Sequence, residues 1–269
     1  MGMRINNDIP AMTGARNAGK ASQALNENLS TLASGLRIKQ AADDAAGLPI
    51  AETFQARVRQ FSQESANLQS GISMIQTAEG GLSSQQDGVG RLRELAVQAS
   101  SGTLADDQRE ALQAEARQII EQIGATAAET EFNDRALLDG AATLTDLGVE
   151  GGARVEIQPS TPAALGIENI DISTAEGAVA ALNTLDHAAG QIGQNRANLG
   201  AQQNRLEHAV EAREQGAQNL AEAESRIRDA DIARTAIEQA RNEMLLRGAF
   251  GAVAQGGAGP EMAARLLGQ

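Results

Sequence analysis

The chain has 269 residues and a formal net charge of −13, and it contains no Cys, Trp or Tyr and only four Phe. The absence of Cys excludes a disulfide framework, a thiolate metal site and a Cys nucleophile. Large rings fill most compact cores, so this composition disfavours an ordinary globule, while its Ala, Leu, Ile, Gln, Glu and Arg content is typical of long helices. The acidic excess lies between two slightly basic ends, which argues against nucleic acid as a partner.

The first 14 residues predict an irregular lead-in, because Gly2, Pro10 and Gly14 interrupt any periodicity. A helix is expected from about residue 15 to 34. Its heptad seam would consist of Leu25, Leu29, Leu32 and Leu36. A turn-rich link should follow, with Asp43 and Asp44 as caps for a second helix that begins near Pro49.

The second helix has the most regular pattern and is expected to run to about residue 100. Its seam positions alternate in steps of three and four: Val58, Phe61, Ser65, Leu68, Ile72, Ile75, Glu79, Leu82, Val89, Leu92, Leu95 and Ala99. Thr103 or Asp106 is expected to cap a third helix. The seam of this third helix would be Leu112, Ala116, Ile119, Ile123 and Ala127.

Between about residues 140 and 174, frequent Gly and Pro separate short alternating runs such as 154–157. This stretch predicts a hairpin or two, with Gly151-Gly152 as a tight turn. It is too short for an ordinary domain. We expect the chain to fold back on itself at this β insert, so that both termini lie at the same end.

A fourth helix is expected from Thr174, with one heptad phase that continues as far as Ile227. Polar residues occupy some seam positions and are expected to fix the helix register: Arg196, Gln203, Arg213 and Glu224. The apolar pattern continues to Phe250. Glycines and Pro260 should then interrupt the helix before a short amphipathic tail at 261–267.

The predicted fold is therefore mainly α, with long paired coiled-coil-like helices from both chain halves and a small β-hairpin insert. A rod one helix thick cannot bury its own seam, so the two halves must pair with each other or with partners.

No residues support an enzyme, a metal site or a cofactor site. His187 and His208 lie 21 residues apart on one expected helix, too far apart for a shared metal. Asp229 and Asp231 lack the Gly and Glu of a calcium loop and are interpreted as acidic helix surface. No apolar run is long enough for a membrane span, and the N-terminal residues lack a cleavable signal peptide pattern.

Several stretches, in order, resemble bacterial flagellin. The motifs are residues 32–38 with 41–48, 71–80, 93–100, 131–133, 199–207 and 223–231. The resemblance implies a structural subunit that polymerises into the flagellar filament for motility. It would be exported by the flagellar type III apparatus and located outside the cell.

By the same resemblance, residues 1–45 and 229–269 would be the filament-core segments. Residues 46–139 and 175–228 would be the helical rods, and 140–174 the insert. The implied partners are other copies of the chain, an export chaperone that binds residues 230–269, and the filament cap and hook-junction proteins. The large outer domains of longer flagellins are missing, which predicts a smooth filament.

Two alternatives have a related architecture. One is the hook–filament junction protein, which usually has a different motif where this chain has residues 42–48. The other is a surface-displayed flagellin relative that acts as an adhesin, although the chain lacks the aromatic platforms that bind sugars.

The resemblance also implies recognition by the flagellin-sensing Toll-like receptor of animal hosts. The family's recognition positions fall on Arg91, Leu95 and Glu115. Arg91 and Glu115 would form charge-assisted bonds and Leu95 an apolar anchor. The same residues could instead join neighbouring subunits. Gly90 departs from the longer polar residue that is usual there.

Overall fold

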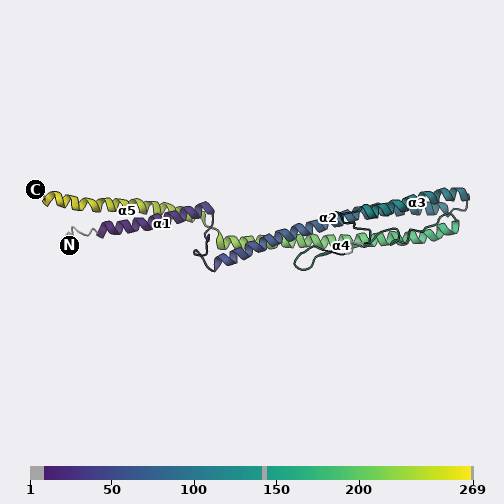
Figure 1. Cartoon of the computed structure of the whole chain (residues 1–269), viewed down its shortest axis with the longest axis horizontal. Coiled ribbons are helices and arrows are strands. Elements are labelled where there is room, and N and C mark those ends of the chain that lie inside the picture. The colour runs from purple at the N-terminus through teal and green to yellow at the C-terminus, as the bar shows by residue number, and fades with distance from the viewer. Residues whose placement is uncertain (1–8, 141–143, 268–269) are drawn as a thin grey trace. The chain divides into compact units, whose positions relative to one another are not determined.

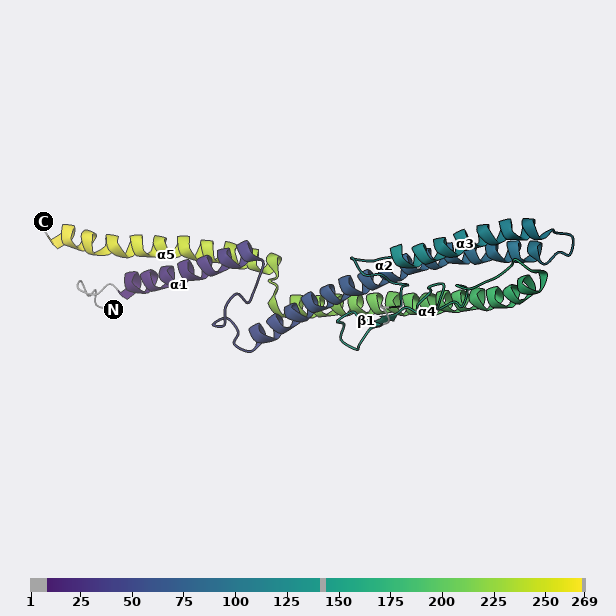
Figure 2. The same cartoon turned by 45° about the vertical axis from the view of Figure 1, so that its right-hand side comes forward.

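A computed structural model describes residues 9–140 and 144–267. The helices in this part of the chain are α1 (Ile9–Ser34), α2 (Gly47–Ala99), α3 (Asp106–Glu129), α4 (Ala175–Arg228) and α5 (Ile232–Leu267). The strands β1 (Leu144–Asp146) and β2 (Arg154–Glu156) form one antiparallel hairpin (Figures 1 and 2). The predicted mainly α fold with paired long helices and a small hairpin is confirmed.

The described chain divides into two compact units. Unit 1 comprises Met1–Arg57 and Asn219–Gln269, and unit 2 comprises Val58–Gln218. Unit 1 contains the α1–α5 pair, and unit 2 contains α3, the hairpin and most of α2 and α4.

In unit 1, α1 and α5 lie side by side and run in opposite directions (Figures 1 and 2). An added Cβ on Gly14, near the start of α1, would meet Val253 near the end of α5. At the other end, Leu36 forms a β-bridge with Asp229. The first and last described residues therefore lie at the same end of this unit, as predicted.

Three boundary predictions near the chain ends are wrong. α1 begins at Ile9 rather than at 15, because Pro10 is tolerated in a first helical turn. α5 continues to Leu267 without the interruption expected at 256–260. Asp229 and Asp231 are not helix surface: they lie between α4 and α5, where Asp231 Oδ1 accepts the Arg234 N–H, the bond of an N-cap.

The link between α1 and α2 is held by backbone and carboxylate bonds within unit 1. Gly35, in the left-handed region at φ 71°, accepts the Ala230 N–H through its carbonyl. Asp44 Oδ1 accepts the N–H groups of Ala46 and Gly47 at the start of α2, and Asp43 Oδ2 accepts those of Lys39 and Gln40. Asp44 thus caps α2 as predicted, whereas the cap predicted for Asp43 is wrong, because Asp43 bonds the loop that precedes the helix.

Unit 2 has the apolar core that the heptad pattern predicts. Leu68, Ile75 and Leu82 of α2 are completely buried, and Leu185 and Ile192 of α4 face the same core. α3 contributes Ala116, Ile123 and Ala127, while its predicted seam residues Leu112 and Ile119 are only partly buried. Periodicity alone thus identified the buried face of α2 and most of that of α3.

The chain first reverses at residues 100–105, between α2 and α3, and the insert then carries it back along the helices to the start of α4. α3 packs closely on α2. A Cβ added to Gly88 of α2 would lie only 3.0 Å from the Ile123 Cγ1 of α3. The insert then runs along the helices, since Leu147 packs on Gly71 of α2, and Gln113 of α3 bonds Ile170 and Ile172. The insert is therefore not the single reversal that was expected, because a turn at 100–105, bonded by Arg109, already sends α3 back along α2.

One hairpin forms as predicted, but its turn is centred on Glu150 and Gly151 rather than on Gly151-Gly152. Thr145 pairs with Val155, and the connection contains Gly148, Gly151 and Gly152, all with positive φ. The Gly152 N–H donates to the Val149 carbonyl, which closes a turn through Glu150 and Gly151. The segment that contains the hairpin leaves and rejoins the helices at neighbouring residues, because the Ser160 N–H donates to the Leu138 carbonyl at 2.9 Å.

Candidate assembly surfaces

Arg91 of α2 and Glu115 of α3 form a surface ion pair in unit 2. Arg91 Nη2 lies 2.7 Å from Glu115 Oε1, and Arg91 Nη1 lies 2.8 Å from Glu94 Oε2. The side chains of Arg91 and Glu115 are 52% and 43% exposed. Hydrogen bonds to Glu94 and then to Glu115 raise the pKa of the Arg91 guanidinium above its ordinary value. The structure therefore brings together two of the three residues expected to bind a partner, as a fixed pair that remains open to solvent.

Leu95 lies elsewhere. Its side chain is 1% exposed and belongs to the core of unit 2. In this conformation it supports α2 from the inside and offers no apolar surface to a partner. Gly90, by contrast, is exposed, and no atom lies within 4 Å of an added Cβ.

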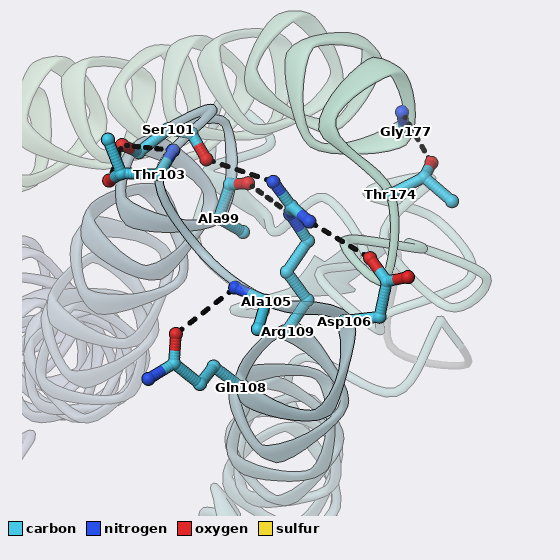
Figure 3. Close-up of polar contacts among 9 residues, drawn as sticks. All are labelled: Ala99, Ser101, Thr103, Ala105, Asp106, Gln108, Arg109, Thr174 and Gly177. Atoms are coloured by element: carbon cyan, nitrogen blue, oxygen red, sulfur yellow. Dashed lines mark hydrogen bonds and ion pairs between the residues drawn. The ribbon is translucent and has the colours of Figure 1, made fainter.

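The turn at the end of α2 depends on Arg109, a residue that the sequence did not single out. Arg109 is 7% exposed, and its guanidinium donates to the Ala99 and Ser101 carbonyls and pairs with Asp106 (Figure 3). It thus satisfies the carbonyl of Ala99, the last residue of α2, which has no intrahelical partner, and adds a second donor to the Ser101 carbonyl, which also accepts the Leu104 N–H.

At the start of α3, the helix cap differs from the prediction. The N-cap of α3 is Ala105, which makes no side-chain cap bond, while Gln108 Oε1 accepts the Ala105 N–H (Figure 3). The expected caps Thr103 and Asp106 are therefore wrong. α4 begins next to Thr174, as predicted, and Thr174 caps it, with its Oγ1 accepting the Gly177 N–H (Figure 3).

Polar seam residues pair across α2 and α4. Arg213 Nε lies 2.7 Å from Glu64 Oε2, whose side chain is 6% exposed, and the Arg213 guanidinium lies 5.3 Å from the Phe61 ring centroid. Arg196 reaches Glu79 at 3.5 Å. Each pair fits a single alignment of the two helices, so the charges support the register role predicted for Arg196 and Arg213.

Glutamine side chains hold the insert against the helices, and sequence reasoning missed them. Gln113 of α3 donates to the Ile170 carbonyl and accepts the Ile172 N–H. Gln85 of α2 donates to the Ser160 carbonyl, and Gln202 of α4 both donates to and accepts from the Glu156 backbone. A primary amide carries both a donor and an acceptor, so it can pair with extended backbone as another strand would.

The α1–α5 pair of unit 1 has a seam in which only small residues and Thr235 are buried, while the larger side chains are half-buried. The contact side of α1 has Gly14, Ala18 and Ala21 buried, followed by half-buried Leu25, Asn28 and Leu32. The predicted seam residue Leu29 is instead 44% exposed. On α5 the corresponding side has Thr235 buried and Gln239, Asn242, Leu246, Ala249 and Val253 half-buried. Such a seam removes little apolar area from water.

Many large apolar side chains of unit 1 lie outside this seam. Ile237 is 70% exposed and Met244 67%, and their spacing of seven residues places them on one face of α5, opposite Gln239. Among the described residues, eleven large hydrophobic side chains are exposed, and only Val97 and Val179 lie in unit 2. The other nine, all in unit 1, are Ile9, Met12, Leu29, Ile50, Ile232, Ile237, Met244, Leu245 and Phe250.

Within residues 9–140 and 144–267, no three His, Asp or Glu side chains gather where they could hold a metal ion. His187 and His208 are both exposed, and His208 contacts Glu211 at 3.3 Å. None of the helices described has the length and apolar character that a membrane crossing requires.

Comparison with known proteins gives two family matches. Residues 5–143 match the bacterial flagellin N-terminal helical region, and residues 182–267 match the bacterial flagellin C-terminal helical region.

Individual relatives match almost end to end. A flagellin of Halalkalibacterium halodurans is 37% identical over 98% of this chain and all of its own length. The flagellar filament core protein flaB2 of Brachyspira hyodysenteriae is 34% identical over 98% of this chain and its own full length.

Two solved structures are similar. The crystal structure of Bacillus cereus flagellin aligns with a TM-score of 0.50 at 26% identity, over 55% of this chain and 88% of that one. A putative flagellar hook-associated protein from Vibrio parahaemolyticus aligns with a TM-score of 0.59 over 69% of this chain and 99% of its own, at 13% identity, a likeness of fold alone.

Proposed function

The chain belongs to the bacterial flagellin family and is a structural subunit of the flagellar filament, and from this premise we propose that unit 1 is the part that packs against other copies inside the filament. In this proposal residues 1–45 and 229–269 form the filament-core segments. Residues 46–139 and 175–228 form the surrounding rods, and 140–174 is an insert on the outside.

One observation supports this proposal above all: no large apolar side chain described in α1 or α5 is fully buried within unit 1. Only small residues and Thr235 are buried in the α1–α5 seam, while Ile237, Met244 and Phe250 face solvent. Clustered exposed apolar side chains are typical of an association surface. Neighbouring copies that present the same face would bury them, and each fully buried side chain of this size contributes about 1.5–3 kcal/mol.

Seeded polymerisation tests the assignment. An Ile237→Ser, Met244→Ser double variant should elongate from filament seeds roughly tenfold more slowly or not at all, as seen by negative-stain microscopy. Val179→Ser is the matched control, since it removes a similarly exposed apolar side chain from unit 2. Normal filaments from the double variant would contradict the role of α5.

The other proposed partners bind at the same ends or at the tip of unit 2. An export chaperone would cover α5 before secretion through the flagellar type III apparatus. Cap and hook-junction proteins would contact the unit 1 surfaces of terminal subunits. A chain truncated at residue 230 that still bound the chaperone tightly would contradict the first of these assignments.

Arg91 and Glu115 are proposed as contacts with the host Toll-like receptor or with a neighbouring subunit. Their exposed ion pair presents both charges on one rigid edge of α2 and α3. Leu95, being buried, is assigned a supporting role beneath them.

We further propose that the chain performs no catalysis and needs no cofactor. Its family is structural. A hook–filament junction role remains the second candidate because the Vibrio hook-associated protein shares this fold. Long uniform filaments from seeds would support the filament role, and persistent monomers or short rings would support the junction role.

A further inference from the structure

The outer edge of β2 is the feature from which this inference starts. β1 pairs with one side of β2, and the Val155 side chain is 1% exposed beneath the hairpin. The Glu156 N–H points away from β1. An open strand edge presents unpaired N–H and C=O groups that can pair with a strand of another chain.

Gln202 of α4 covers this edge. Its Oε1 accepts the Glu156 N–H at 2.8 Å, and its Nε2 donates to the Glu156 carbonyl at 2.8 Å. Both bonds are made to one residue, which is the pattern of a hydrogen-bonded pair in an antiparallel sheet. Arg205, three residues further along α4, donates from Nη2 to the Arg154 carbonyl at 3.1 Å.

The hairpin is docked by other contacts that do not involve Gln202. Val155 and Ile157 are buried in the core of unit 2. Asn67 donates to the Leu147 carbonyl at 3.1 Å, and Arg213 donates to the Glu150 carbonyl. The specific contribution of Gln202 is therefore to satisfy the exposed edge of β2.

We propose that Gln202 and Arg205 act as an edge guard, in which side chains of α4 replace a third strand and prevent β2 from pairing with β2 of a second copy. The segment 154–157 alternates charged and β-branched residues and would extend a sheet readily. A filament subunit meets other copies at high local concentration, where an open edge would compete with helical packing.

Gln202→Leu tests the guard, because leucine keeps the helix and approximate size but makes neither bond. Gln203→Leu is the matched control: it is the adjacent residue, and its amide bonds Glu207 on the same helix. Residue-resolved amide exchange of Glu156 and thioflavin T fluorescence of seed-free monomer are measured for both. Gln202→Leu should exchange at Glu156 about fivefold faster or more and form thioflavin-positive β aggregates sooner, and Gln203→Leu should do neither.

If the amide exchange rate of Glu156 were unchanged in Gln202→Leu, the bond between Gln202 and the edge of β2 would be contradicted. Faster exchange without faster aggregation than Gln203→Leu would overturn the guarding role. If Gln202→Leu loses helicity, Arg205→Met replaces it, with the same aggregation comparison against Gln203→Leu. Filament growth from seeds is scored separately, so a failure of the guard is distinguishable from a failure of the assembly assignment.

Discussion

Arg91 on α2 and Glu115 on α3 are joined by a 2.7 Å ion pair although 24 residues separate them in sequence. The pair crosses two antiparallel helices, and Arg91 also binds Glu94 one turn further along α2. The charges are thus held in a fixed pattern without being withdrawn from solvent.

Arg91→Ala is expected to lower receptor signalling by the monomer about tenfold or more, the loss typical of removing an interface arginine. Exposed ion pairs add little to folding, so the free energy of unfolding should change by less than about 1 kcal/mol. A reporter-cell dose response and a urea melt measure the two effects. Arg93→Ala is the control, since Arg93 forms an equally exposed pair with Asp186 at 2.8 Å. Undiminished signalling by Arg91→Ala would exclude it from the receptor contact.

Gly90 and Gly88 should respond oppositely to alanine. Gly90 has open space around an added Cβ, so Gly90→Ala should stabilise unit 2 by about 0.5–1 kcal/mol. A Cβ on Gly88 would lie 3.0 Å and 3.1 Å from two Ile123 carbons, so Gly88→Ala should destabilise it. Thermal melts of the pair provide the comparison. A stabilising Gly88→Ala would contradict the close packing of α3 on α2.

Arg109→Met should destabilise unit 2 by about 2–3 kcal/mol, because it leaves the Ala99 carbonyl without its buried donor and the Ser101 carbonyl with the Leu104 N–H alone. Chemical denaturation followed by circular dichroism measures the loss. Arg117→Met, an exposed α3 position, serves as control and should change the stability little. Equal stability of the two variants would show that the turn at 100–105 holds without Arg109.

Acid should loosen the start of α2 through Asp44. Backbone bonds from Gly47 and then Ala46 lower the pKa of the Asp44 carboxyl below its ordinary 3.8. A carboxyl with a lowered folded pKa stabilises the fold above the unfolded value and ceases to do so as the pH falls through the folded value. Protection of the Gly47 amide should therefore fall below pH 3.8. Asp44→Asn should abolish this pH dependence because its amide oxygen accepts at any pH, and an unchanged profile would contradict the cap.

The only lysines, Lys20 and Lys39, both lie in unit 1. If this unit packs inside the filament, an amine-reactive acetylating reagent should modify Lys20 readily in monomers and poorly in filaments, as mass spectrometry can show. Lys39 already bonds Ser30 and Thr31 and should react slowly in both states. Equal reaction of Lys20 in monomers and filaments would place its side of α1 on the outside.

Sequence periodicity predicted the parts of the fold in which large side chains repeat. The core of α2 and α4 was found because Leu68, Leu82 and Leu185 fall in step. The α1 seam was assigned the wrong phase at Leu29, because the buried residues Gly14, Ala18 and Ala21 give almost no hydropathy signal. Small residues allow two helices to pack closely, but they do not produce a hydrophobic repeat in the sequence.

The residues proposed to contact partners and the residues that hold the insert were likewise only partly predicted from the sequence. Arg91 and Glu115 were found through motif resemblance, which also selected Leu95 as a partner contact although the heptad pattern placed it in the buried seam of α2. The heptad pattern selected Gln203, which bonds its own helix, and gave no sign that Gln202 pairs with a strand. The path of the insert depends on such single amide contacts. They do not repeat along the sequence, so hydrophobic periodicity cannot predict them.

The bond between Ser160 and Leu138 makes residues 139–159 a closed loop with adjacent ends. The entropy of closing a flexible loop grows only logarithmically with its length, at about 0.6 kcal/mol for each doubling. The amount of chain on the outside of unit 2 can therefore change greatly at almost constant cost to the helices that carry it. Subunits with long and short excursions would then share the same scaffold, and the breadth of a filament would be set independently of the contacts that hold it together.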